Sequence, residues 1–77
     1  MTRQAFLSAY RNALLARYSW TADAAKLDRF MESVTVTLAG GDTWNHDGEA
    51  VTEAWKWIGG RGKPTLKALR ALPNEDT

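Results

Sequence analysis

A chain of 77 residues without cysteine has to hold its fold together by packing, because it can form no disulfide and no cysteine-based zinc site. This length predicts a single domain. Four tryptophans provide large side chains for a small core: Trp20, Trp44, Trp55 and Trp57. Dense packing or self-association is therefore expected to stabilise the fold, and a homodimer is one expected state.

Hydrophobic spacing predicts an all-α fold, specifically a small compact four-helix domain. In the first helix, Phe6, Tyr10 and Leu14 recur at the spacing of one helical face. In the third, Trp55 lies on the apolar face and is expected in the core. The predicted helices cover about residues 2–18, 21–39, 47–58 and 64–72, in a domain of residues 1–73 with a disordered tail at 74–77.

Local chemistry predicts where the helices begin and end. Thr21 is the expected N-cap of the second helix, with Asp23 in its first turn, and Asp47 is the expected N-cap of the third. Pro64 suits the first position of the fourth helix, since its missing N–H would be unpaired there. Glycine pairs at 40–41 and 59–60 are expected to end the second and third helices.

The first two helices are expected to form a hairpin, with the third and fourth packing across it as a second, C-terminal hairpin. The stretch "GKPTLKALRAL" in this second hairpin is similar to the recognition segments of bacterial helix-turn-helix and winged-helix regulators. The likeness covers about residues 50–72 and implies a fourth helix that enters the major groove of DNA. The turn is more glycine-rich than the usual one, and Asn, Gln and Ser are missing from the start of the fourth helix.

Charge is unevenly distributed along the chain, although the net charge is only +1. Residues 41–58 sum to −3 and residues 59–72 to +4. On a helix, the basic residues of the second segment fall in one stripe that could follow phosphates. The predicted nucleic-acid contacts are Arg61, Lys63, Thr65, Lys67 and Arg70, and Arg3 and Arg11 could extend them.

Two other interpretations of the basic stripe stay open. Lys67 and Arg70 could form a solvated face, or could pair with Glu49 and Glu53 of the preceding helix. Exposed pairs of this kind contribute only about 0–1 kcal/mol. The leading prediction is a small non-enzymatic accessory or regulatory protein that binds DNA through the C-terminal hairpin.

The tryptophans support an alternative function. Trp44 precedes the third helix and Trp57 lies at the edge of its apolar face, so both could anchor a protein partner. The protein would then be an adaptor or inhibitor of a larger complex, of the kind that phages and other mobile elements encode. A homodimeric structural domain is a third possibility.

Catalytic and metal-binding motifs are incomplete. Around "DTWNHDGE", the two essential carboxylates of a calcium-binding EF-hand loop are replaced by Thr43 and Ala54. Trp57 and Pro64 occupy the positions that a P-loop needs for glycine and Ser or Thr. His46, the single histidine, lacks the neighbours of a triad. We therefore expect no catalytic residue, no metal and no cofactor.

The N-terminal segment does not resemble a signal peptide, because Arg11 and Arg17 interrupt its apolar stretch. No apolar run approaches the roughly 20 residues that span a bilayer. Together with the lack of cysteine, this pattern predicts a cytoplasmic protein without a membrane partner.

Overall fold

The computed structural model describes residues 2–40 and 48–73, and in these two ranges every regular element is helical, as predicted. Trp44, Asp47 and residues 74–77 lie outside the described residues, so the predictions about them stay predictions. No described helix has the length and apolar character needed to cross a membrane. The elements are α1 (Arg3–Arg17), the 3-10 helix η1 (Ser19–Ala22), α2 (Ala24–Leu38), α3 (Gly48–Trp57) and α4 (Leu66–Arg70).

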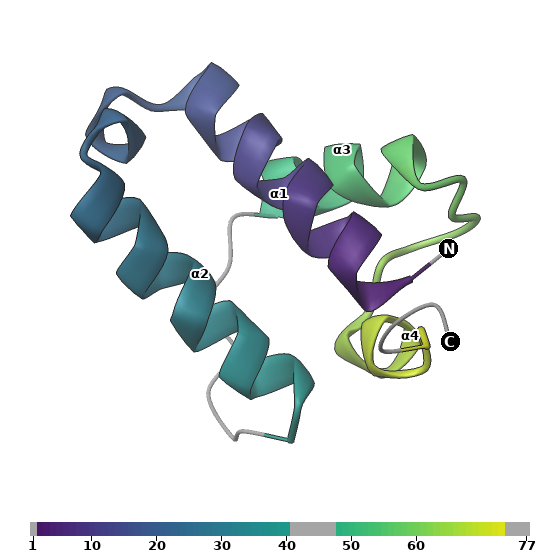
Figure 1. Ribbon diagram of the computed structural model, residues 1–77. Coiled ribbons are helices and arrows are strands. Elements are labelled where there is room, and N and C mark those ends of the chain that lie inside the picture. Colours follow the sequence, from purple (N-terminus) through teal and green to yellow (C-terminus); the bar gives the residue numbers. More distant parts are fainter. Residues whose placement is uncertain (1, 41–47, 74–77) are drawn as a thin grey trace.

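Helices α1 and α2 diverge from the turn at η1 like the arms of a V, and α3 runs beside α1 (Figure 1). The short α4 lies near the N-terminal end of α1 and also contacts α2. The two ends of the domain are tied together, because the N–H of Arg3 donates to the carbonyl of Pro73 at 2.8 Å. The last residues of the domain therefore lie against the start of its first helix.

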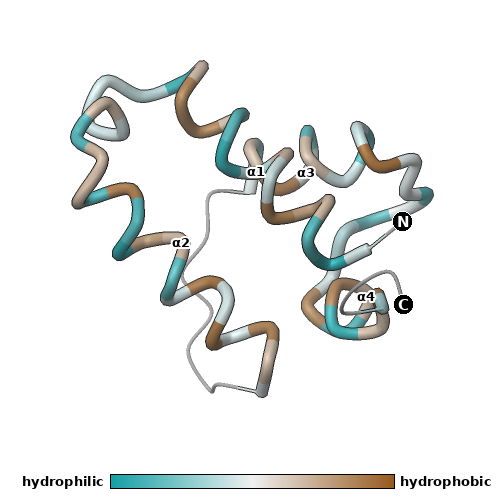
Figure 2. Tube along the Cα trace, viewed as in Figure 1, coloured by the Kyte–Doolittle hydropathy of each residue, from teal (hydrophilic) through white to brown (hydrophobic). Residues whose placement is uncertain are grey.

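Each long helix buries one side, and hydrophobic and hydrophilic residues alternate along the chain accordingly (Figure 2). The predicted face of α1 is confirmed, since Phe6, Tyr10 and Leu14 are buried. Trp55 is also buried, as expected. The core contains Phe6, Tyr10, Ala13, Leu14, Leu27, Val34, Leu38, Ala50, Val51, Ala54, Trp55, Leu69 and Leu72.

Aromatic rings connect the two arms of the V. Phe6 and Tyr10 lie 5.8 Å apart between ring centroids, and Tyr10 meets Phe30 of α2 edge-on at 6.0 Å. Trp20 of η1 also meets Phe30 edge-on, at 5.7 Å, and stacks on Tyr18 at 6.3 Å. Aromatic pairs at such distances contribute about 0.5–1.5 kcal/mol beyond their buried area. Of these pairs, Tyr10–Phe30 joins α1 to α2, and Trp20–Phe30 joins η1 to α2.

The N-cap of α2 differs from the prediction. Asp23 is the cap, and its carboxylate accepts from the N–H groups of Ala25 and Lys26 at 3.0 and 3.3 Å. Thr21 is buried, and its hydroxyl lies 3.1 Å from the carbonyl oxygen of Leu14 and 2.6 Å from that of Tyr18. The predicted cap of α2 thus binds the end of α1 instead, because η1 turns its side chain inward.

Helix α3 ends in a Schellman motif, as the glycine pair predicted. Gly59 has φ +82°, and its N–H donates to Lys56 at 3.0 Å while that of Gly60 donates to Trp55 at 2.8 Å. The indole of Trp55 packs directly on Gly60, where an added Cβ would overlap the ring atoms. Two glycines are therefore required here for different reasons, a left-handed backbone at Gly59 and a close approach at Gly60.

The predicted C-terminal hairpin needs correction. Helix α3 packs chiefly against α1, and α4 lies against α2, so α3 and α4 do not form a closely packed pair. The physical reason is the size of α4, because five residues offer too little surface to cover the apolar side of α3. The connection from Ile58 to Thr65 is also longer than the three or four residues that join a helix-turn-helix.

Candidate nucleic-acid interface

The C-terminal third of the chain contains a long stretch without acidic residues. Between Glu53 and Glu75 there is no Asp or Glu, and α4 contacts the end of α2, where Thr35, Val36 and Thr37 are uncharged. The cations of this basic segment are Lys56, Arg61, Lys63, Lys67 and Arg70. The stretch therefore carries a concentration of positive charge, although Lys56 lies one helical turn after Glu53.

The first two predicted contacts lie in the connection between α3 and α4. The backbone of Arg61 is held in place because its carbonyl accepts from the indole Nε1 of Trp55 at 3.2 Å. Lys63 lies beside the first turns of α3 and lines a shallow cavity with Val51 and Thr52. Both cationic side chains are exposed, and neither forms an ion pair with a described carboxylate.

The predicted start of α4 shifts by two residues. Thr65 is the N-cap, and its hydroxyl oxygen accepts from the N–H of Ala68 at 3.1 Å, so Pro64 precedes the helix. The Thr65 hydroxyl can accept from a backbone donor of the first turn, whereas Lys63, which would precede a helix beginning at Pro64, has no side-chain acceptor. Thr65 thus acts first as a cap, while Lys67 extends from α4 as an exposed cation with no described ion-pair partner.

Arg70 is placed differently from the other predicted contacts. Its guanidinium Nε and Nη2 donate to the carbonyl of Thr37 at 3.2 and 2.9 Å, which caps the C-terminal end of α2. The carbonyl of Arg70 in turn accepts from the Nη2 of Arg3 at 2.9 Å. Arg70 and Arg3 therefore join the ends of α1, α2 and α4, a structural role that the sequence did not indicate.

The glutamates that could have neutralised the basic segment bind elsewhere. Arg17 donates to Glu49 at 3.0 Å and to Glu53 at 3.2 Å, so the alternative in which these acids pair with Lys67 and Arg70 is wrong. The hydrogen bond to Glu53, followed by the charges of both acids, raises the pKa of Arg17. The reason is topological: α3 packs on α1, which brings its acidic side to the C-terminal turn of α1.

Arg11, proposed as an extension of the basic surface, lies 3.4 Å from Asp28 of α2. It and Arg3 are therefore both engaged within the fold. The structure leaves three of the predicted contacts, Arg61, Lys63 and Lys67, as exposed cations without a described acidic partner. Lys56 has the same properties and was missed, although the absence of acids after Glu53 was visible in the sequence.

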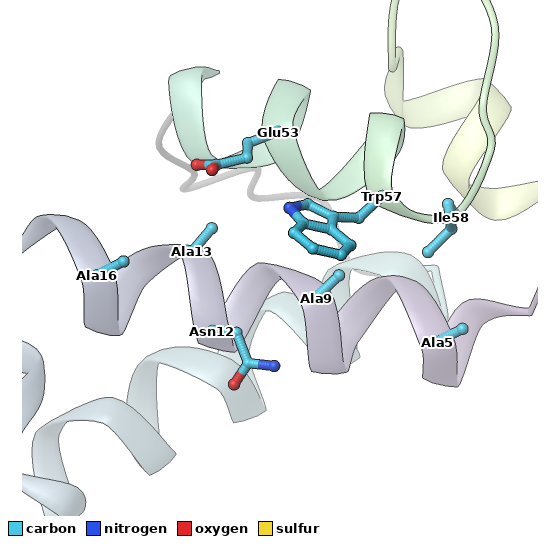
Figure 3. Close-up of a pocket in the computed structure, with 8 residues that line it drawn as sticks. All are labelled: Ala5, Ala9, Asn12, Ala13, Ala16, Glu53, Trp57 and Ile58. Carbon is cyan, nitrogen blue, oxygen red and sulfur yellow. The ribbon is translucent and has the colours of Figure 1, made fainter.

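Trp57 is the most exposed large hydrophobic residue described, with 77% of its surface accessible. Its indole extends from α3 toward α1 and lies over Ala9 and Ala13 (Figure 3). Together they border an open groove of about 390 Å³, lined by Ala5, Ala9, Asn12, Ala13, Ala16, Glu53, Trp57 and Ile58. The alanines recur every three or four residues along α1, a spacing that could have revealed this small-residue face.

Among the described residues, no group of three or more acidic or histidine side chains is placed to hold a metal ion. Asp42, His46 and Asp47 of the loop before α3 lie outside the described ranges, while Glu49, in the first turn of α3, binds Arg17. Neither a family model nor a curated protein nor a solved structure matches this chain. The function is therefore argued from the chain's own residues.

Proposed function

We propose that the protein is a small non-enzymatic accessory protein that binds nucleic acid through the phosphate contacts of Arg61, Lys63 and Lys67. The observation that carries the proposal is that these three exposed cations follow one another with no acid between them and no described ion-pair partner. Elsewhere cations lie close to acids: Arg11 pairs with Asp28, Arg17 pairs with Glu49 and Glu53, and the exposed Lys26 and Arg29 lie among Asp23, Asp28 and Glu32 in the sequence. Unpaired cations in a row are what a phosphate backbone attracts.

The dimensions of α4 limit how the basic segment can work. Five helical residues extend about 7.5 Å, at about 1.5 Å per residue. At the start of α4, the hydroxyl of Thr65 already accepts from a backbone N–H of the first turn. At its end, the guanidinium of Arg70 already binds the carbonyl of Thr37 in α2. We therefore propose contacts with the backbone of the nucleic acid, and not the insertion of a recognition helix into a major groove.

The test is a charge reversal with a matched control. Lys63→Glu with Lys67→Glu changes the formal net charge from +1 to −3, and Lys26→Glu with Arg29→Glu on α2 makes the same change. We expect the first pair to abolish binding to a labelled mixed-sequence oligonucleotide in fluorescence anisotropy at low salt. The control pair, which lies among Asp23, Asp28 and Glu32, should lose much less.

Equal losses in the two double variants would show that net charge, and not the basic segment, drives binding. Circular dichroism of each variant verifies that the helices are retained. Arg70 is left unchanged, because reversing it would remove the cap of α2 and confuse binding with folding.

The second candidate function is a protein-interaction module, and the exposure of Trp57 favours it. A partner would place an apolar side chain in the groove beside Trp57. In this case Trp57→Ala would abolish the biological activity while the Lys63 and Lys67 reversal left it intact. The nucleic-acid function predicts that the charge reversal is the damaging change.

A further inference from the structure

The proposed function leaves open which nucleic acid the basic segment binds, and the structure contains features that bear on this question. The bases of a duplex are stacked inside it, and they can be reached only from its grooves. Helix α4 is too short to insert into one. A single strand, in contrast, offers both its phosphates and the faces of its bases.

Trp57 lies near the basic segment, and its indole is exposed, as stacking on a base requires. The 77% accessibility of Trp57 contrasts with that of Trp55, two residues earlier, which is buried. The groove beside Trp57 is apolar along the alanines of α1, and its volume of about 390 Å³ is at the lower end for ligand pockets. Flat apolar base faces suit such a surface.

The basic segment begins within reach of Trp57. Arg61 lies four positions after Trp57, so their Cα atoms cannot be more than about 14 Å apart. The real separation is shorter, because the Schellman motif turns the chain back and the carbonyl of Arg61 binds the indole of Trp55. Neighbouring nucleotides of one strand can therefore contact Trp57 with a base and Arg61 with a phosphate.

The charges around Trp57 are balanced, because Lys56 and Arg17 share a surface hollow with Glu49 and Glu53. Lys56 precedes it in the sequence and is exposed. The groove contains a single described carboxylate, Glu53, and that group already accepts a hydrogen bond from the Nε of Arg17 at 3.2 Å. A protein partner would instead bury the apolar groove in an interface centre, where lysine is depleted.

Resting on the nucleic-acid function proposed above, we infer that the ligand is single-stranded and that one of its bases stacks on Trp57. The phosphates on either side of this base then contact Lys56 and Arg61, and the strand continues toward Lys63 and Lys67. Such a surface reads little sequence, since every base has a face that can stack.

The experiment compares a labelled mixed-sequence single strand with the duplex of the same sequence, both measured by anisotropy. We expect Trp57→Ala to raise the Kd for the single strand about 5- to 100-fold and to leave the Kd for the duplex unchanged. Trp57→Phe, which keeps an aromatic face, should retain most of the affinity. Val36→Ala removes exposed apolar surface on α2, where Val36 is 58% accessible, and should change neither Kd.

The outcomes separate the inference from the function on which it rests. If Trp57→Ala leaves single-strand binding intact while the Lys63 and Lys67 reversal abolishes it, the nucleic-acid function stands and stacking on Trp57 is wrong. Trp57 would then return to the protein-interaction alternative. If the unmodified protein binds neither strand form at low salt, both proposals fall.

Discussion

Two regions of this small fold differ in what their cations contact. Where α1 meets α3, the guanidinium of Arg17 is bound by Glu49 and Glu53, so cation and acids meet within the molecule. From Arg61 to Lys67 the sequence contains no acid, and Arg61 and Lys67 form no described ion pair. The first region uses charge to join helices, and the second leaves charge for a ligand.

Arg70 shows that membership of the basic segment does not by itself decide the role of a residue. It lies one helical turn from Lys67 on α4, yet its guanidinium caps α2 through the carbonyl of Thr37. The comparison therefore separates cations that hold the fold from cations that remain available. Substitutions that remove one kind of cation or the other should therefore differ in their effect on stability and on binding.

Gly60→Ala should have the largest effect, because the new methyl group would overlap the indole of Trp55 and displace the chain that carries Arg61. Overpacking of a core typically costs about 1–3 kcal/mol, and we expect a loss near the upper end in urea denaturation. Gly48→Ala is the matched control, since no atom lies within 4 Å of its added Cβ. Equal stability of the two variants would contradict the close packing of Trp55 on Gly60.

Arg70→Met and Lys67→Met form the second pair. Losing the charged hydrogen bonds to Thr37 should lower the free energy of unfolding by about 1–2 kcal/mol in the Arg70 variant. The Lys67 variant should stay within about 0.5 kcal/mol of the unmodified protein, as expected for an exposed side chain. A Lys67 variant as unstable as the Arg70 variant would remove the distinction between the two roles.

Thr65→Ala should cost about 1 kcal/mol, because it removes the N-cap that accepts from Ala68. Thr52→Ala, on the exposed side of α3, removes a hydroxyl that bonds only within its own helix at Gly48, and should be nearly neutral. Thermal denaturation measures both. If Thr65→Ala leaves the melting temperature unchanged, Thr65 does not cap α4 in solution.

Arg17→Met should have the smallest effect on stability, because its ion pairs are exposed to solvent. The raised pKa of Arg17 keeps it charged, so its contribution is fully present at neutral pH and would be lost only in strongly alkaline solution. The difference between the variant and the unmodified protein should vanish near 1 M salt, where the Debye length is about 3 Å. A difference that high salt does not change would indicate packing by the arginine stem.

Local spacing in the sequence was sufficient for much of the fold. The buried side of α1, the burial of Trp55 and the glycine stop after α3 each depend on residues a few positions apart. The role of Thr21 and that of Arg70 depend on partners seven and 33 residues away, which no local pattern reveals. The choice of Arg17 as the partner of Glu53 likewise follows only from the packing of α3 on α1.

The same limit applies to the candidate site. Charge clustering identified Arg61, Lys63 and Lys67, because an acid-free stretch is a property of the sequence itself. It could not exclude Arg70, because nothing in the local sequence distinguishes Arg70 from Lys67. Only the fold shows that the guanidinium of Arg70 binds the end of α2. Nor could charge clustering show that Trp57 borders a groove, since the alanines that line the other side belong to α1.

The most direct test of the central claim is the dependence of nucleic-acid affinity on salt. The three phosphate contacts of Arg61, Lys63 and Lys67 predict a slope of log affinity against log salt of about −2.7 for a duplex, and the fourth contact, at Lys56, predicts about −2.8 for a single strand. Lys63→Gln with Lys67→Gln should reduce the magnitude of the slope by the amount that two phosphate contacts contribute. Arg17→Gln, which removes a paired cation, should leave the slope unchanged. A slope near zero, or one that Arg17→Gln lowers as much as the lysine variant does, would contradict the account.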